Sequence, residues 1–177
     1  WREGQLLLVG TALVGWHSSR ATRVGGGSFG GECIACLGGI ERGLGVVEFI
    51  GELDGLGVNR IEEILARRFA PGDFEKPARP AMTAILDAEG VIKSVRGGLE
   101  GALTDQSKKR KHDVFAMREM IRMGLLEPLG FIPGTRNPTD PLTKEKKATR
   151  NTQGLLWDVI RGKGVNWDDV VWFGEVE

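Results

Sequence analysis

Two short apolar runs near the start of the chain constrain its fold more than any other feature of the sequence. Residues 5–9 (QLLLV) and 12–16 (ALVGW) are separated only by Gly10 and Thr11. Two such runs joined by a two-residue turn predict a pair of antiparallel strands, a β-hairpin. A hairpin at the front of the chain argues against a wholly parallel sheet of the Rossmann type.

Segments with helical and with strand-like patterns alternate after the hairpin. Apolar residues at helical spacing predict helices, and short apolar runs predict buried strands. We expect helices over residues 32–53, 88–95, 113–125 and 155–161, and strands over 81–86 and 129–132. Asp113 is expected to cap one helix, and Thr139 or Asp140 another that begins at Pro141. This order predicts an α/β fold in which helices cover one mixed sheet.

The length of the chain allows one globular domain. With 177 residues, of which 41% are hydrophobic, the chain can bury one sizeable core. We expect residues 1–150 to form this domain, with the Pro-rich stretch 58–80 as a surface insertion or loop, and residues 151–177 to form a C-terminal helix and tail. Basic and acidic residues number 24 each, so any basic surface for nucleic acid must be local.

Cysteine usage and hydropathy predict an intracellular protein of the cytoplasm or the nucleus, without a membrane partner. No run approaches the roughly 18 apolar residues of a membrane span, and Cys33 and Cys36 form no disulfide framework. Their helical spacing favours packed side chains over a zinc site, because a structural zinc requires four ligands. The start at Trp1, directly before an apolar strand, is typical of an excerpt from a longer polypeptide.

Three carboxylates occupy similar positions in the predicted elements. Glu32 lies in the first turns of a helix, Asp87 follows a buried strand, and Asp140 begins the last helical region. Strand ends of this kind are where α/β folds place their chemistry. Carboxylates are the ligands that Mg²⁺ and Mn²⁺ prefer, and two such ions clamp a phosphodiester during its displacement. Acidic residues also cap helices for stability alone, which is the alternative interpretation.

Four segments of the chain resemble, in this order, successive blocks of the RNase H domain of copia-type (LTR) retroelement polyproteins. The family has a Ser-x-x-x-Glu helix start, a strand that ends in Asp, an Arg-Glu pair in a helix after a basic stretch, and an Ala-Asp-x-x-Thr-Lys motif. The matching segments are SSRATRVGGGSFGGECIACLGGIERG, ILDAEGVIKSV, KKRKHDVFAMREMI and FIPGTRNPTDPLTK. In the same order, the residues that match the four family blocks are Ser28 to Glu32, Asp87, Arg118 with Glu119, and Thr139 to Lys144. The resemblance covers the chain from Trp16 to about Lys144.

The resemblance implies an RNase H-like fold and hydrolysis of the RNA strand of an RNA–DNA hybrid. The family uses two Mg²⁺ (or Mn²⁺) ions held on four acids, and Glu32, Asp87 and Asp140 match three of these catalytic and metal-binding positions. A hybrid is recognised by its backbone shape and 2′-hydroxyls. The implied partners are this hybrid and the upstream reverse transcriptase region of the same polyprotein.

The chain departs from the family pattern at two places. The family's first acid lies in a strand before the hairpin and has no counterpart in this sequence, and Glu3 is out of place to replace it. Glycines also stand around Glu32 where the family has alanine. Two hypotheses therefore stay open: a catalytic RNase H-type module, and an inactive remnant that keeps the fold as a structural or nucleic-acid-binding piece. The missing first acid favours the remnant.

Three further signals have simple structural interpretations. The segment GGGSFG (25–30) satisfies a dinucleotide-binding pattern, but no strand directly precedes it, so it is predicted to be a turn. His112 is predicted to be a solvated loop residue rather than a group that assists product release. The basic run 108–111 is predicted to be a solvated cluster, with phosphate contacts or nuclear import as alternatives.

Overall fold

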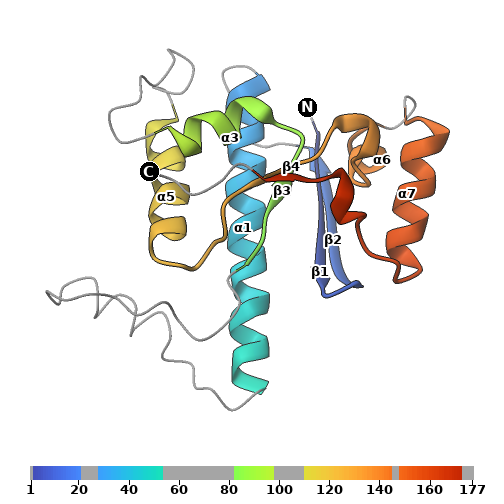
Figure 1. Cartoon of the computed structure of the whole chain (residues 1–177), viewed down its shortest axis with the longest axis horizontal. Helices are drawn as coiled ribbons and strands as arrows, with labels where there is room; N and C mark the ends of the chain where they lie inside the picture. The colour runs from blue at the N-terminus through green and yellow to red at the C-terminus, as the bar shows by residue number, and fades with distance from the viewer. Residues whose placement is uncertain (1, 21–27, 54–81, 98–109, 145–147, 173–177) are drawn as a thin grey trace, which may run out of the picture.

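The computed structural model describes residues 2–20, 28–53, 82–97, 110–144 and 148–172 (Figure 1). The predicted insertion 58–80, Lys108 and Lys109, and residues 25–27 of the glycine-rich segment 25–30 lie outside these ranges. The other half of that segment, 28–30, begins helix α1 (Ser28–Leu53), so the predicted turn is wrong for these three residues. The described residues form a mixed structure of helices and small sheets, as the α/β prediction requires.

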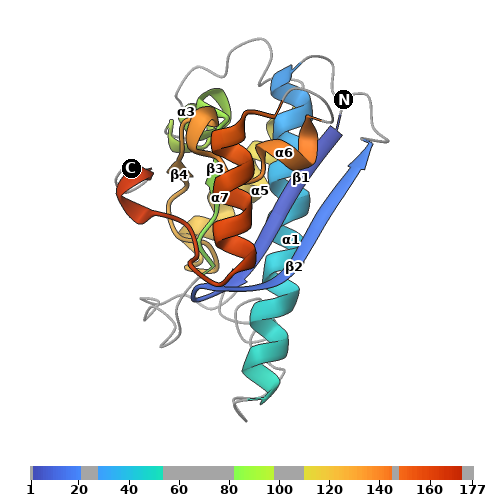
Figure 2. The same cartoon turned by 90° about the vertical axis from the view of Figure 1, so that its right-hand side faces the viewer.

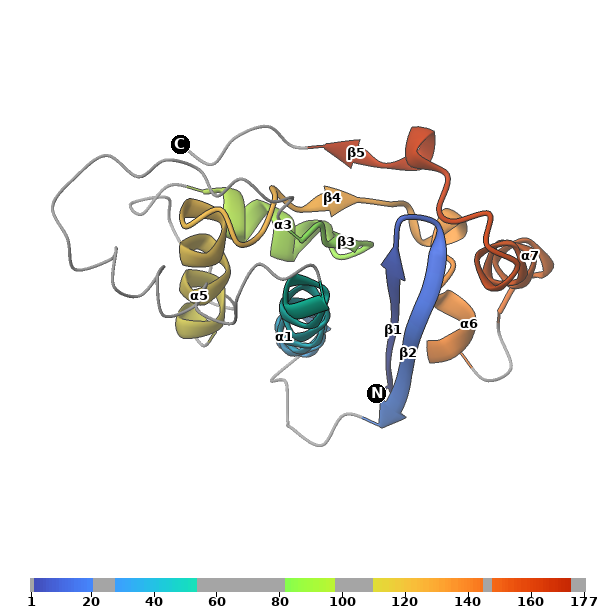
Figure 3. The ribbon, with the colours of Figure 1, turned by 90° about the horizontal axis from the view of Figure 1, so that it is seen from below.

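The predicted hairpin is confirmed and is longer than its apolar runs. Strand β1 (Arg2–Val9) pairs in antiparallel fashion with β2 (Ala12–Arg20), and Gly10 makes the turn with a φ of 60°. A positive φ is a conformation that glycine adopts without the strain of a β-carbon. Helix α1 (Ser28–Leu53) lies on one face of the hairpin, and helices α6 (Asp140–Thr143) and α7 (Arg150–Ile160) lie on the other (Figure 3).

Helix α1 (Ser28–Leu53) is the longest element among the described residues, although five glycines were expected to weaken it. Two of these glycines lie where other segments come close. A β-carbon on Gly39 would be 3.3 Å from Nε2 of Gln5, and one on Gly43 would collide with the side chain of Met82. Tertiary packing therefore offsets the low helix propensity of these positions, since most helical stability in proteins comes from packing.

A second sheet carries the remaining strands of the described residues. Strand β3 (Ile85–Leu86) runs parallel to β4 (Gly130–Phe131), which is antiparallel to β5 (Val171–Trp172). The prediction of one mixed sheet is therefore wrong, because the described part of the hairpin pairs only with itself and lies beside this three-stranded sheet (Figures 2 and 3). Strand β5 was not predicted. The strands predicted over 81–86 and 129–132 are shorter in the described structure, with two residues each in β3 and β4.

Helices α3 (Glu89–Arg96) and α5 (Lys111–Arg122) pack with α1 around the hydrophobic core. The fully buried side chains of the core come mainly from these three helices and from the loop after α5. They include Cys33, Ile40, Val91, Ile92, Val95, Val114, Met117 and Leu126. The predicted cap at Asp113 is wrong, because α5 begins two residues earlier, after Arg110, and Asp113 instead pairs with Arg110 at 3.5 Å.

Four short elements complete the described chain. They are the 3₁₀ turn η1 (Gly134–Arg136), α6 (Asp140–Thr143), α7 (Arg150–Ile160) and the 3₁₀ turn η2 (Trp167–Asp169). Helix α7 begins five residues before its predicted start because Thr149 caps it, accepting a hydrogen bond from the backbone N of Thr152. The helices among the described residues are all too short or too polar to cross a membrane.

Candidate functional site

Asp87 stands directly after β3, as the sequence predicted. Strands β3 and β4 are parallel, so the segments that follow them lie at the same edge of the sheet. One carboxylate oxygen of Asp87 lies 3.6 Å from the position that a β-carbon on Gly134 would take. Gly134 follows β4 and begins η1. The turn after β4 thus lies beside the Asp87 carboxylate, at a distance that would also accommodate a β-carbon.

Glu32 reaches the neighbourhood of Asp87 from α1. It lies in the second turn of this helix and is half-buried. Burial raises the pKa of the Glu32 carboxyl above its ordinary value of 4.5, and repulsion by the Asp87 carboxylate raises it further. Two acids that are far apart in the sequence therefore share one electrostatic environment.

Asp140 is held in place by the turn that precedes it and by one lysine. Its side chain is 6% exposed, and one carboxylate oxygen lies 2.6 Å from Nζ of Lys144. The backbone N of Asp140 donates to the carbonyl of Asn137, whose own N donates to the carbonyl of Gly134. The buried Asn137 side chain accepts hydrogen bonds from the backbone and the hydroxyl of Thr139. Two consecutive turns thus connect Asp140 to the glycine that approaches Asp87.

The hairpin positions α6, and with it Asp140. The Ser18 hydroxyl on β2 donates to the carbonyl of Leu142 at 2.7 Å. A β-carbon on Gly4 would lie 2.8 Å from side-chain atoms of both Leu142 and Thr143, so the glycine allows a close approach of β1 to α6. The face of the hairpin that carries Gly4 and Ser18 therefore acts as the support for this part of the site.

The three predicted acids are arranged as a pair and a single residue. Among the described residues, no three histidine, cysteine, aspartate or glutamate side chains gather into a group that holds a metal ion. The chemistry of Glu32 and Asp87 is of the kind that could hold one hard divalent cation, because Mg²⁺ is bound through one or two carboxylates together with water and phosphate oxygens. Asp140 is neutralised by Lys144 instead. The described residues thus do not assemble the three-acid group on which two ions would sit.

Glu3, which lies on the opposite face of β1 from Gly4, belongs to a separate polar cluster between the hairpin and α1. Its carboxylate accepts a hydrogen bond from Ser19 at 2.9 Å and lies 3.6 Å from Nε2 of His17. Arg42 of α1 contacts Nε2 of His17 and donates to Gln5. The side chain of Gln5 in turn donates to the carbonyl of Ala35 in α1. These contacts tie the hairpin to α1, the helix that presents Glu32.

Cys33 and Cys36 are packed side chains. Cys33 is fully buried, and the thiol of Cys36 donates to the sulfur of Met117 at 3.5 Å. Burial raises the pKa of each thiol to about 12, so both are protonated at neutral pH. A protonated thiol is a poor nucleophile. The helical spacing of the two cysteines had favoured this interpretation.

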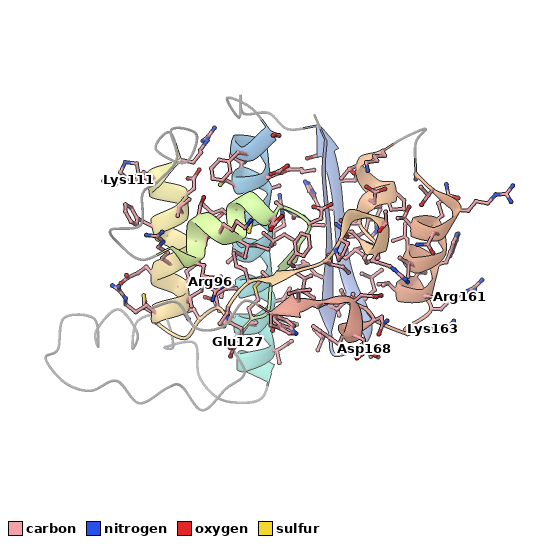
Figure 4. The ribbon with its side chains drawn as sticks, turned by 45° about the horizontal axis from the view of Figure 1, so that its top comes forward. Arg96, Lys111, Glu127, Arg161, Lys163 and Asp168 are labelled. Carbon is pink, nitrogen blue, oxygen red and sulfur yellow. The ribbon has the colours of Figure 1, made fainter. Side chains whose placement is uncertain are left out.

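Two pairs of positive side chains lie at opposite ends of the described structure. Lys111 and Arg96 lie on the side formed by α3 and α5, and Arg161 and Lys163 lie at the far end beside α7 (Figure 4). Within the predicted basic run, Lys111 lies 5.3 Å from the centre of the Phe115 ring, and the next residue, His112, is exposed at the start of α5. His112 is therefore helical rather than part of a loop.

Sequence reasoning missed several residues that position the site, namely Gly4, Ser18, Gly134, Asn137 and Lys144. Only the spacing of Asp140 and Lys144, four residues apart in a predicted helix, carried a signal for such a contact. Comparison of the chain with protein-family models, curated proteins and solved structures finds no match. The resemblance to RNase H domains therefore depends on the four sequence segments described above.

Proposed function

We propose that this chain is an RNase H-type nuclease domain of a copia-type retroelement polyprotein, which hydrolyses the RNA strand of an RNA–DNA hybrid. The observation that carries the proposal is the position of Asp87 directly after β3, at the sheet edge that the turn after β4 also reaches. Burial raises the pKa of Glu32 on α1, and repulsion by the Asp87 carboxylate raises it further, which supports a place for Glu32 near Asp87. Both residues match acidic positions of the family. The fold is RNase H-like in this proposal, with the hairpin, α1, β3 and α3 following in the family's order.

The residues of the chain have distinct tasks in this mechanism. Glu32 and Asp87 would bind a Mg²⁺ or Mn²⁺ ion, which supplies an activated water and stabilises charge on the phosphate. Repulsion between the two carboxylates favours cation binding, because a cation relieves it. The hairpin holds α6 against itself and so keeps Asp140 near the turn that approaches Asp87. A hybrid would be recognised by its phosphates and 2′-hydroxyls.

The remnant hypothesis has a specific observation in its favour. The described residues gather no group of three ligands, and Asp140 is paired with Lys144. Two ions placed close together need several carboxylates to offset their mutual repulsion. We therefore expect little or no hydrolysis by the 177-residue chain alone. We expect more from a version extended upstream by a strand that carries a further acid.

A nuclease assay on a fluorescently labelled RNA–DNA hybrid tests the proposal. The 177-residue chain and the extended version are each assayed with Mg²⁺ and Mn²⁺, beside Asp87→Asn and Glu32→Gln. The control is Asp158→Asn, which removes an exposed acid paired with Lys163 on the far side of the molecule. We expect the extended version to cleave, Asp87→Asn and Glu32→Gln to abolish cleavage, and the control to retain it.

Three outcomes would contradict parts of the proposal. Cleavage that survives Asp87→Asn would remove the assigned site. An extended version that binds the hybrid tightly without cleaving it would establish the remnant hypothesis in place of the nuclease. Cleavage by the short chain that disappears in its own Asp87→Asn variant would refute our expectation that the short chain is inactive.

A further inference from the structure

The Nε2 atom of His17 lies among side chains that make opposite demands on it. It is 2.9 Å from Oγ of Ser19, 3.6 Å from a carboxylate oxygen of Glu3 and 3.5 Å from Nη2 of Arg42. A carboxylate only accepts hydrogen bonds, and a guanidinium only donates them. One ring nitrogen carries either a proton or a lone pair, so it cannot interact favourably with Glu3 and Arg42 at the same time.

The Ser19 hydroxyl links a protonated Nε2 to Glu3. Ser19 donates to the Glu3 carboxylate at 2.9 Å, which leaves its oxygen to accept the proton of Nε2. This chain of hydrogen bonds lies entirely within the hairpin of β1 and β2. Arg42, in contrast, belongs to α1. A proton on Nε2 therefore directs the ring of His17 to the hairpin, and a lone pair there directs the ring to α1.

We propose that His17 is a pH-sensitive switch in the contact between the hairpin and α1. Histidine is the side chain whose charge ordinarily changes between about pH 5 and 8. When the neutral ring carries its proton on Nδ1, Nε2 accepts a hydrogen bond from Arg42. The charged ring carries a proton on both nitrogens, so it repels the guanidinium and is stabilised by the Glu3 carboxylate. Acid pH thus breaks the contact between His17 and Arg42.

The switch changes one contact and leaves the fold intact. Among the described residues, the charged side chains in contact with His17 are Glu3 from β1 and Arg42 from α1. Gln5 donates to the carbonyl of Ala35 in α1 at 2.7 Å, and Arg42 donates to Gln5 as well. These two bonds contain no group that titrates between pH 5 and 8. They hold the hairpin on α1 in both states of the switch.

Double-mutant cycles on the full chain at pH 8 and pH 5 test this inference. Urea unfolding of the wild type, His17→Leu, Arg42→Met and the double variant gives the coupling between the two side chains, and the Gln5 bond of Arg42 cancels in the cycle. At pH 8 we expect a favourable coupling of about two- to fivefold in the unfolding equilibrium constant, the range of a partly exposed contact with a charged group. At pH 5 the coupling should vanish or become unfavourable. A cycle of His17→Leu with Glu3→Gln should show the reverse, with the larger favourable coupling at pH 5.

His112 provides the matched control, because the chain has two histidines. It is exposed at the start of α5, on the other side of α1 from the hairpin (Figure 3). A cycle of His112→Leu with Arg42→Met should therefore show no coupling at either pH. Nitrogen-15 NMR of the imidazole rings in the wild type locates the proton directly and does not depend on the stability of any variant. We expect the neutral ring of His17 to carry its proton on Nδ1 at pH 8.

Two results would overturn the switch. The first is a coupling between His17 and Arg42 that is the same at pH 8 and pH 5, which would make the contact purely structural. The second is a proton on Nε2 of the neutral ring, because Arg42 would then have no acceptor on His17 at any pH.

Discussion

Arg118 offers a sharp test of how the core holds the segment after Asp87. Its side chain, 8% exposed, lies on α5, and its guanidinium donates to the carbonyls of Val95 at 2.9 Å and Ser94 at 2.6 Å. These carbonyls belong to the last turn of α3, where a helix leaves its carbonyl groups without intrahelical partners. Arg118 thus ties the end of α3 to α5. We expect Arg118→Met to destabilise the domain strongly.

The magnitude follows from the two hydrogen bonds. Each bond from a charged donor contributes about 1.5–3 kcal/mol, and removing the donor leaves two carbonyls at least partly unsatisfied. Burial lowers the pKa of Arg118, which indicates a desolvation cost of the charged guanidinium that methionine does not have. The net loss should be about 2–4 kcal/mol. For a chain of this size it corresponds to a fall in the melting temperature of about 5–15 °C.

Urea unfolding followed by circular dichroism measures this loss. The control is Arg122→Met on the same helix, where the arginine is 65% exposed and its ion pair with Glu119 is 3.7 Å long. Exposed pairs of this kind contribute about 0–1 kcal/mol. The stability loss of Arg118→Lys should lie between those of Arg118→Met and Arg122→Met, because one ammonium cannot reproduce the fixed fork of the guanidinium. A loss below about 1 kcal/mol in Arg118→Met, or one equal to that of the control, would refute the reasoning.

Two further substitutions test the site and the second sheet. Glu32→Gln should stabilise the domain at pH 7, because burial and the Asp87 carboxylate raise the pKa of Glu32 above 4.5 and so make its ionised form costly. This gain in the free energy of unfolding should shrink as the pH falls through the raised pKa towards 4.5. Urea unfolding measured at several pH values between 8 and 4 tests this, and a gain that stays constant would contradict it. Gly130→Ala should cost about 1–3 kcal/mol, because its β-carbon would lie 2.8 Å from the Val170 side chain and 3.0 Å from the Trp172 ring. Gly154→Ala, which meets nothing within 4 Å on α7, should instead stabilise by up to about 1 kcal/mol, and equal effects of the two alanines would refute the packing argument.

Local patterns predicted the elements that depend on neighbours in the sequence. The hairpin was predictable because its apolar runs and its turn lie within a few residues of each other. The helix after Asp87 was predictable because Val91 and Val95 recur at helical spacing and are buried on one face. Helix starts were less predictable, since Asp113 has the chemistry of a cap but the helix begins before it.

The division into two sheets depends on distant contacts. Gly130 and Trp172 pair across a long stretch of sequence, and each strand contributes only two residues. Backbone hydrogen bonds of this kind involve any residue type except proline, so they leave no pattern in the sequence. The single mixed sheet predicted from the order of elements was therefore wrong, although the α/β class was right.

The sequence by itself determined that Asp87 follows a strand, that Glu32 lies near a helix start and that Asp140 lies at another, because these positions depend on local periodicity and capping chemistry. Only the tertiary structure decided that Glu32 and Asp87 share an environment while Asp140 is buried and paired with Lys144. The physical reason is that electrostatic interaction depends on distance and burial. Both are set by the packing of α1, the two sheets and α6, which no local pattern of residues encodes.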